Sequence, residues 1–74
     1  MRLTLKVPDT EGMLCKVTSA VAEQNGYISA LGTYPSDEAL KWWVVLKVRF
    51  VDKDALVEAL KTTPEIEILD VREG

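Results

Sequence analysis

Apolar and polar residues alternate in two stretches of the chain, and this period of two predicts β-strands. Leu3, Leu5 and Val7 form the first stretch, and Pro8 is expected to end it because proline cannot donate to a strand ladder. The second and longer stretch runs from Leu40 to Val51. Its side chains predicted to face the core are Trp42, Val44, Leu46, Val48 and Phe50. The opposite face then carries Lys41, Trp43, Val45, Lys47 and Arg49.

A helical period follows the first strand, from Met13 to about Gln24. The side chains expected to face inward are Leu14, Val17 and Val21. Asp9 or Thr10 is the expected N-cap, because a short polar side chain can accept a hydrogen bond from the free amides of the first turn. Gly26 is the expected left-handed residue that closes the helix.

A second helix is predicted from Lys53 to about Thr63, with Asp52 as its cap and Pro64 as its stop. The side chains expected to face inward are Leu56, Ala59 and Leu60.

Two more strands complete the pattern. Tyr27 to Tyr34 is rich in strand-forming residues and is followed by the turn sequence Pro35–Glu38, and the segment from Glu65 to Glu73 supplies the last strand. The order is therefore β-α-β-β-α-β. This order predicts an α+β, ferredoxin-like fold: a four-stranded antiparallel sheet with two helices on one face. Residues 1–74 are expected to form a single domain.

Composition and charge narrow the possible functions. The net charge of −3 over 74 residues gives no broad attraction to nucleic acid or to acidic membranes. No apolar run approaches the roughly 20 residues that span a bilayer, and the first residues do not resemble a signal peptide. The single cysteine fits a reducing compartment. We therefore expect a soluble, cytoplasmic protein without membrane or nucleic-acid partners.

The segment Gly12–Ala20 raises the question of a metal site. Gly12, Met13 and Cys15 match the start of the motif in small metal-carrier domains, but Thr18 stands where the second cysteine would be. Soft metals need converging thiolates, and the chain has one cysteine and no histidine. We predict no metal and no cofactor, with Cys15 as a small buried or half-buried helix residue.

The residue types in the sequence also argue against catalysis, since neither a nucleophile–base pair nor a phosphate-binding glycine loop is present. RNA recognition is an alternative function, because Trp43, Lys47 and Arg49 are predicted on the open sheet face. The first strand offers no aromatic residue there, which makes base stacking a weak hypothesis. Trp43 is the expected interface residue, packing against another chain.

The sequence VPDTEGMLCKVTSAVAEQNGYISAL resembles the ACT domain, a regulatory module that senses small molecules. The positions that carry the resemblance are Asp9, Gly12, Leu14, Val17, Ala22, Glu23 and Ile28. The resemblance implies an allosteric, amino-acid-binding domain whose ligand lies between two copies in a homodimer. A weaker resemblance is to the ACT portion at the end of paired CBS-domain proteins of the acetoin-utilisation type. Some ACT domains bind no ligand and serve as dimerisation modules, which is the alternative function.

The expected ligand site lies around the loop before the first helix. Its predicted residues are Asp9, Thr10, Glu11, Gly12, Met13, Leu14, Tyr27 and Ile28. The free amides of a helix N-terminus suit the ligand's carboxylate, and Asp9 or Glu11 suits its ammonium. Many family members have proline at position 11 and asparagine at position 27, so Glu11 and Tyr27 depart from the pattern and would reshape the pocket.

Overall fold

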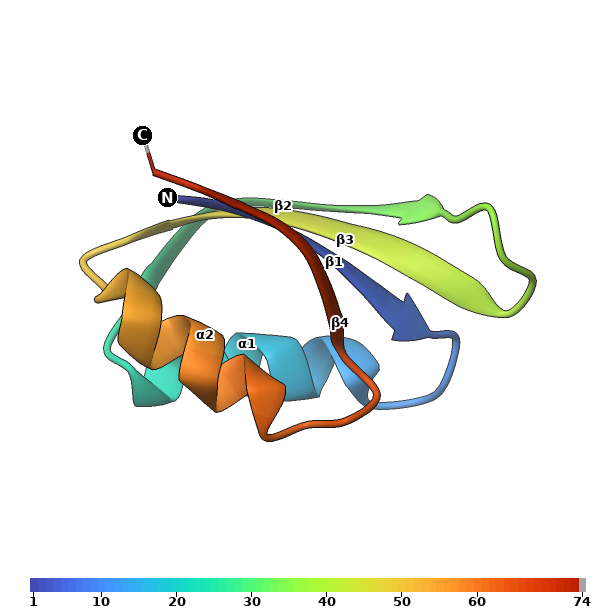
Figure 1. Ribbon diagram of the computed structural model, residues 1–74, viewed down its shortest axis with the longest axis horizontal. Coiled ribbons are helices and arrows are strands. Elements are labelled where there is room, and N and C mark those ends of the chain that lie inside the picture. The colour runs from blue at the N-terminus through green and yellow to red at the C-terminus, as the bar shows by residue number, and fades with distance from the viewer. Residues whose placement is uncertain (74) are drawn as a thin grey trace.

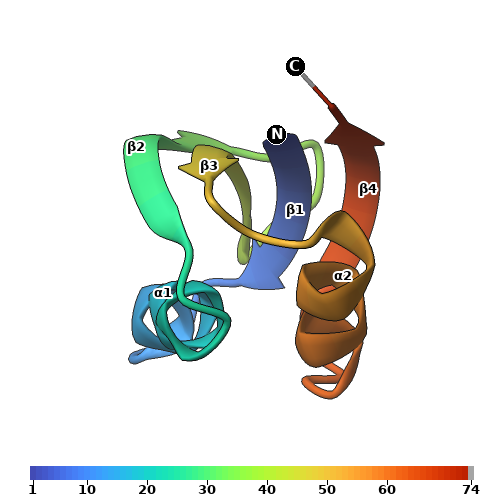
Figure 2. The ribbon, with the colours of Figure 1, turned by 90° about the vertical axis from the view of Figure 1, so that its left-hand side faces the viewer.

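The computed structural model describes residues 1–73, and its six elements follow the predicted order (Figure 1). They are β1 (Arg2–Pro8), α1 (Met13–Glu23), β2 (Tyr27–Pro35), β3 (Lys41–Arg49), α2 (Lys53–Lys61) and β4 (Glu67–Arg72). The strands pair antiparallel in the order β2-β3-β1-β4. Both helices cover one face of this sheet and leave the other face open (Figures 1 and 2). The predicted α+β, ferredoxin-like fold is confirmed.

The core lies between the sheet and the two helices. Its buried apolar side chains are Leu3, Leu5, Val7, Met13, Val17, Val21, Val44, Leu46, Val48, Leu56, Leu60 and Ile66. The sheet register explains this set, because residues that lie directly opposite each other on neighbouring strands point to the same face. Leu5 pairs with Val44 on β3 and with Ile68 on β4, so each row across the sheet adds to one apolar layer.

Helix α1 is turned relative to the sequence prediction. Met13 is buried and Leu14 is 43% exposed, so Met13 rather than Leu14 begins the inward face with Val17 and Val21. The predicted cap is also wrong. Gly12 is the N-cap residue, in a left-handed conformation with φ 83°, and no side chain caps the helix.

At the C-terminal end of α1, Asn25 and not the predicted Gly26 is the left-handed residue. Asn25 takes the left-handed conformation, with φ 60°. Its amide donates to the Ala22 carbonyl and the Gly26 amide donates to the Val21 carbonyl, both at 2.9 Å, which is the Schellman arrangement. Gly26 is required for space, because a Cβ there would lie 2.8 Å from Val21 Cγ1.

Strand β3 is shorter than the predicted Leu40–Val51. Leu40 and Phe50 flank it, and both have φ 63°, a backbone conformation that does not continue a strand. Phe50 is 81% exposed rather than in the core, and its ring centroid lies 6.5 Å from that of Tyr27. Trp42 is half-buried against the core, as predicted. Trp43 lies on the open face with 36% of its surface exposed.

The second half of the fold follows the prediction more closely. Asp52 caps α2, accepting a hydrogen bond from the Asp54 amide at 3.2 Å, and Leu56 and Leu60 are buried. Strand β4 is shorter than the predicted Glu65–Glu73 and contains a bulge opposite Thr4 and Leu5. Within residues 1–73, no helix is long and apolar enough to span a membrane.

Candidate ligand site beside the first loop

A cavity of about 190 Å³ lies where the β1–α1 loop meets the helix side of the sheet. The loop and the first turn of α1 supply Asp9, Thr10, Met13 and Leu14. The sheet supplies Val7, Pro8, Thr33, Trp42 and Val44. This volume is below the roughly 300–1,000 Å³ of pockets for drug-sized molecules, so the cavity suits a smaller ligand. Its walls are mainly apolar, and its polar side chains are Asp9 and Thr10 from the loop and Thr33 from β2.

Four of the eight predicted ligand residues therefore line one cavity, and four do not. Glu11 and Gly12 lie in the same loop but are exposed and do not line it. Tyr27 and Ile28 lie at the opposite end of β2, paired with Arg49 and Val48. Within one chain the structure does not bring these two residues to the loop.

Sequence reasoning missed Thr33 as a lining residue. Thr33 pairs with Val44 and so shares the core-facing side of the sheet. A bulge between Ile28 and Ala30 shifts the register of β2, which reverses the face expected from simple alternation counted from Ile28. The one available signal was the apolar Leu31, which marks the same face as Thr33.

Backbone amides remain available at the start of α1. The Asp9 amide donates to the Leu40 carbonyl at 2.7 Å, and the Thr10 amide donates to the Pro8 carbonyl at 2.9 Å. Among residues 1–73, the amides of Leu14 and Cys15 have no acceptor. Unpaired amides and the helix dipole give this end of α1 a positive partial charge, which suits an anionic group.

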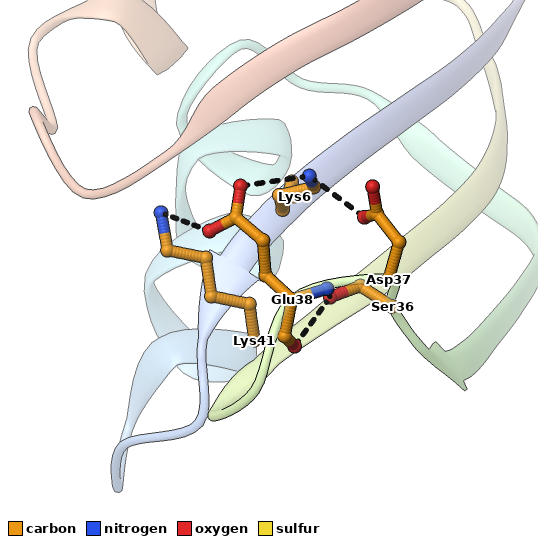
Figure 3. A network of polar contacts seen from close by, with 5 residues as sticks. All are labelled: Lys6, Ser36, Asp37, Glu38 and Lys41. Atoms are coloured by element: carbon orange, nitrogen blue, oxygen red, sulfur yellow. Dashed lines mark hydrogen bonds and ion pairs between the residues drawn. The ribbon is translucent and has the colours of Figure 1, made fainter.

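The β2–β3 turn is held beside this loop by an ion-pair network (Figure 3). Lys6 is 8% exposed, and its Nζ lies 3.0 Å from Asp37 Oδ1 and 3.3 Å from Glu38 Oε1. The hydrogen bond from Lys6 lowers the pKa of both carboxyl groups, and that with Asp37 raises the pKa of Lys6. Lys41 also approaches Glu38, at 3.5 Å. The alternation along β1 puts Lys6 on the face opposite to Leu5 and Val7, but this pattern does not indicate that Lys6 is buried.

The structure corrects the interpretation of Cys15. Its side chain is exposed on α1, with Sγ 3.8 Å from Ser19 Oγ, rather than buried or half-buried. It is exposed because the inward face of α1 begins at Met13, which turns position 15 toward solvent. Within residues 1–73, no three carboxylate, thiolate or imidazole groups come together as metal ligands would.

Comparison with known proteins shows similarity in structure. No family model matches the sequence, and no curated protein does. Solved structures do match. The formyltetrahydrofolate deformylase of Burkholderia mallei ATCC 23344 gives a TM-score of 0.73 at 21% identity, and that of Pseudomonas syringae pv. tomato DC3000 gives 0.74 at 23%. A Bacteroides thetaiotaomicron protein gives 0.67 at 26% identity.

These matches cover nearly all of this chain and a minor part of the others. The alignments span 93% and 92% of this chain but 27% and 25% of the two deformylase chains. The match to the Bacteroides protein covers 92% of this chain and 45% of that one. At these identities the deformylase matches establish the shared fold alone.

Proposed function

We propose that this chain is an ACT-like regulatory domain that binds a small molecule, with an amino acid as the ligand. The observation that carries the proposal is the cavity beside the uncapped start of α1. Its walls are mainly apolar, and its lining includes Leu14, whose amide has no acceptor among residues 1–73, and the exposed residue Asp9. An amino acid matches this arrangement, because its carboxylate, ammonium and side chain each meet a group of suitable chemistry.

The proposed role is regulatory rather than catalytic. The chain matches about a quarter of each deformylase chain, which is consistent with a module that acts on a larger attached or partner protein. We further propose that the ligand lies at a homodimer interface, where burial by the second copy strengthens its contact with Asp9. Binding and association would then be one linked equilibrium. The weaker resemblance to CBS-linked domains, the cytoplasmic location and the role of Trp43 in association stay predictions.

Thermal unfolding against a panel of the common amino acids at millimolar concentration tests the proposal. A ligand at 100 times its Kd stabilises the folded state by about 2.7 kcal/mol. In a domain this small, each kcal/mol raises the Tm by roughly 4–8 °C, so specific binding gives a large shift. We expect one compound, or one chemical class, to raise the Tm.

A matched pair of variants locates the response. Leu14 lines the cavity and is 43% exposed, whereas Leu69 lies on β4 away from it and is 45% exposed. Leu14→Trp should fill the cavity mouth and abolish the Tm shift, while Leu69→Trp should leave the shift intact. A shift that survives Leu14→Trp contradicts the site. Unchanged Tm values for the wild type across the whole panel contradict amino-acid sensing.

The second candidate is a dimerisation module that needs no ligand. The observation that favours it is the edge strand β2, whose sequence YISALGTYP contains no charged residue. Charged residues normally protect a sheet edge from pairing with another chain. For this function the chain should dimerise to the same extent with and without every amino acid of the panel.

A further inference from the structure

The open face of the sheet, on the side away from the helices, carries a row of cations. The register places Arg2 directly opposite Lys47 on β3 and directly opposite Arg72 on β4. Arg49 follows Lys47 by two residues and so points to the same face. Like charges directly opposite each other destabilise a sheet, yet a chain of net charge −3 gathers four cations here.

One acidic side chain, Asp70, offsets this charge at one end of the row. Arg72 Nε lies 2.7 Å from Asp70 Oδ2. Among residues 1–73, Arg2, Lys47 and Arg49 form no ion pair, and all three are exposed. The β1–β3 part of the row is therefore complementary to an external anion.

A hollow of about 290 Å³ adjoins these cations on the open face. Small residues of β2 and β3 form its floor, and larger side chains stand at its sides. The floor is Ala30, Gly32 and Val45, and the sides are Arg2, Lys47 and Tyr34. One part of the hollow is therefore apolar and suits an uncharged group. The other part lies next to two cations and suits an anion.

Tyr34 supplies an aromatic wall whose position depends on Gly32. A Cβ at position 32 would lie 2.9 Å from Tyr34 Oη and 3.1 Å from Tyr34 Cε2. The ring therefore lies back along β2, over residue 32, and the absence of a side chain there makes room for it. Planar rings pack well against such an aromatic surface, in offset or edge-to-face geometry.

We propose that this hollow binds a small molecule that joins a planar ring to an anionic group, such as a phosphate or a carboxylate. The ring of the ligand packs against the ring of Tyr34, which itself covers Gly32, and the anion lies between Arg2 and Lys47. Successive side chains on one face of a strand are about 7 Å apart, so ring and anion are one such step apart. A mononucleotide spans this separation.

The proposed site is separate from the amino-acid cavity. That cavity is lined by Val7 and Val44, which face the helices, whereas Val45 and Gly32 face the other way. A long nucleic-acid strand is a poorer occupant, because the hollow accommodates one ring and the net charge of −3 repels further phosphates.

A titration with AMP, followed by ¹H–¹⁵N correlation spectra of the whole chain, tests the proposal. We expect saturable shifts at the amides of Ala30, Gly32 and Lys47. Adenosine and ribose 5-phosphate should each bind more weakly, since each lacks one of the two groups. Added salt should weaken AMP binding because the ionic contacts are exposed. Tyr34→Ala should weaken binding of AMP and adenosine but not of ribose 5-phosphate.

Two lysine variants provide the matched control. Lys47→Gln should weaken AMP binding by about two- to fivefold, the effect of losing one exposed ion pair. Lys53→Gln on α2 makes the same change in net charge outside the hollow and should leave binding unchanged. Both side chains are exposed, so folding should be retained.

Three results would overturn the proposal. The first is an absence of AMP-induced shifts at the three amides. The second is an equal loss of affinity in Lys47→Gln and Lys53→Gln, which would indicate an effect of net charge alone. The third is tighter binding per nucleotide to a short single-stranded oligonucleotide than to AMP, which would assign the face to a nucleic-acid strand.

Discussion

At the scale of single residues, the two residues that end α1 meet different requirements. Asn25 provides a left-handed backbone conformation, and Gly26 provides a position without a side chain. Asn25 adopts the left-handed conformation, which asparagine tolerates better than most residues. Gly26 follows it in a position where Val21 and Val48 leave no room for a side chain. The helix end is thus fixed by the backbone of one residue and the packing around the next.

Gly26→Ala should destabilise the fold. The added Cβ would meet Val21 Cγ1 at 2.8 Å and Val48 Cγ1 at 3.1 Å, and both side chains belong to the tightly packed core. Overpacking of this kind costs about 1–3 kcal/mol. Urea unfolding would measure the loss. Asn25→Gly is the control, because glycine adopts the same left-handed conformation without added bulk; equal stability of Gly26→Ala and wild type would contradict the packing argument.

At the scale of elements, the Lys6 network ties the β2–β3 turn to the centre of the sheet. Lys6 belongs to β1, and its partners Asp37 and Glu38 lie in a turn more than thirty residues later (Figure 3). The same turn accepts a hydrogen bond from the loop before α1, through the Leu40 carbonyl and the Asp9 amide. The position of the turn and the shape of the candidate ligand loop are therefore connected.

The network should make stability depend on pH at both ends of the scale. Asp37 and Glu38 have pKa values lowered from their ordinary 3.8 and 4.5, so their contribution is present above those values and is lost as the pH falls through the folded-state values. Lys6 has a pKa raised above 10.5, so its contribution is present below 10.5 and is lost as the pH rises through the folded-state pKa.

Lys6→Met tests this origin of the pH dependence. The free energy of unfolding, measured between pH 7 and pH 3, should fall less steeply in Lys6→Met than in the wild type, because the two carboxyl pKa values return toward normal. Lys53→Met removes an exposed lysine of α2 and should keep the wild-type slope. Identical slopes for Lys6→Met and wild type would show that the acid sensitivity arises elsewhere.

The element order was predictable from the sequence because alternating and helical burial are local patterns. Features set by distant contacts or by one local irregularity were not. Lys6 is buried by a turn that is remote in sequence, and the bulge after Ile28 reverses the face on which Thr33 lies. The phase of α1 depends on the left-handed Gly12, which brings Met13 inward in place of Leu14.

In the candidate site, too, some features were predictable from the sequence and others depend on contacts between distant residues. The loop from Asp9 to Leu14 was predicted as a ligand loop from the resemblance to the ACT domain, and the structure places part of it around one cavity. The contributions of Thr33 and Trp42 follow from strand register, which the sequence did not specify. Tyr27 and Ile28 were predicted from the same resemblance, in which the ligand lies between two copies, so their contribution to the site requires a second copy.

At the scale of the whole molecule, the two edges of the sheet differ in their protection. The β4 edge carries Glu67, Asp70 and Arg72 and is interrupted by a bulge. The β2 edge is uncharged along its nine residues, and from Ala30 to Pro35 its pairing with β3 is regular. Charges and bulges discourage pairing between strands of different chains. We therefore expect a homodimer in which β2 pairs with β2 of a second copy.

Such a dimer would also complete the ligand site. Two-fold pairing runs the β2 strands antiparallel, so Tyr27 of the partner subunit would lie near Pro35, at the end of β2 that contains Thr33. In one chain Tyr27 and Thr33 are six residues apart along the strand, about 20 Å. The predicted contribution of Tyr27 and Ile28 is therefore consistent with a site built from two copies.

Leu31→Lys tests both the predicted pairing of β2 with β2 and the predicted completion of the ligand site by a second copy. Leu31 is exposed near the middle of β2, and a lysine there places like charges face to face across the two-fold axis. Sedimentation analysis should show a dimer for the wild type and for Leu69→Lys on β4, and a monomer for Leu31→Lys. A dimer that persists in Leu31→Lys contradicts the β2 interface. If the variant is monomeric but its Tm still rises fully with the amino-acid ligand, the cavity is complete within one chain, and regulation must act through the β1–α1 loop alone.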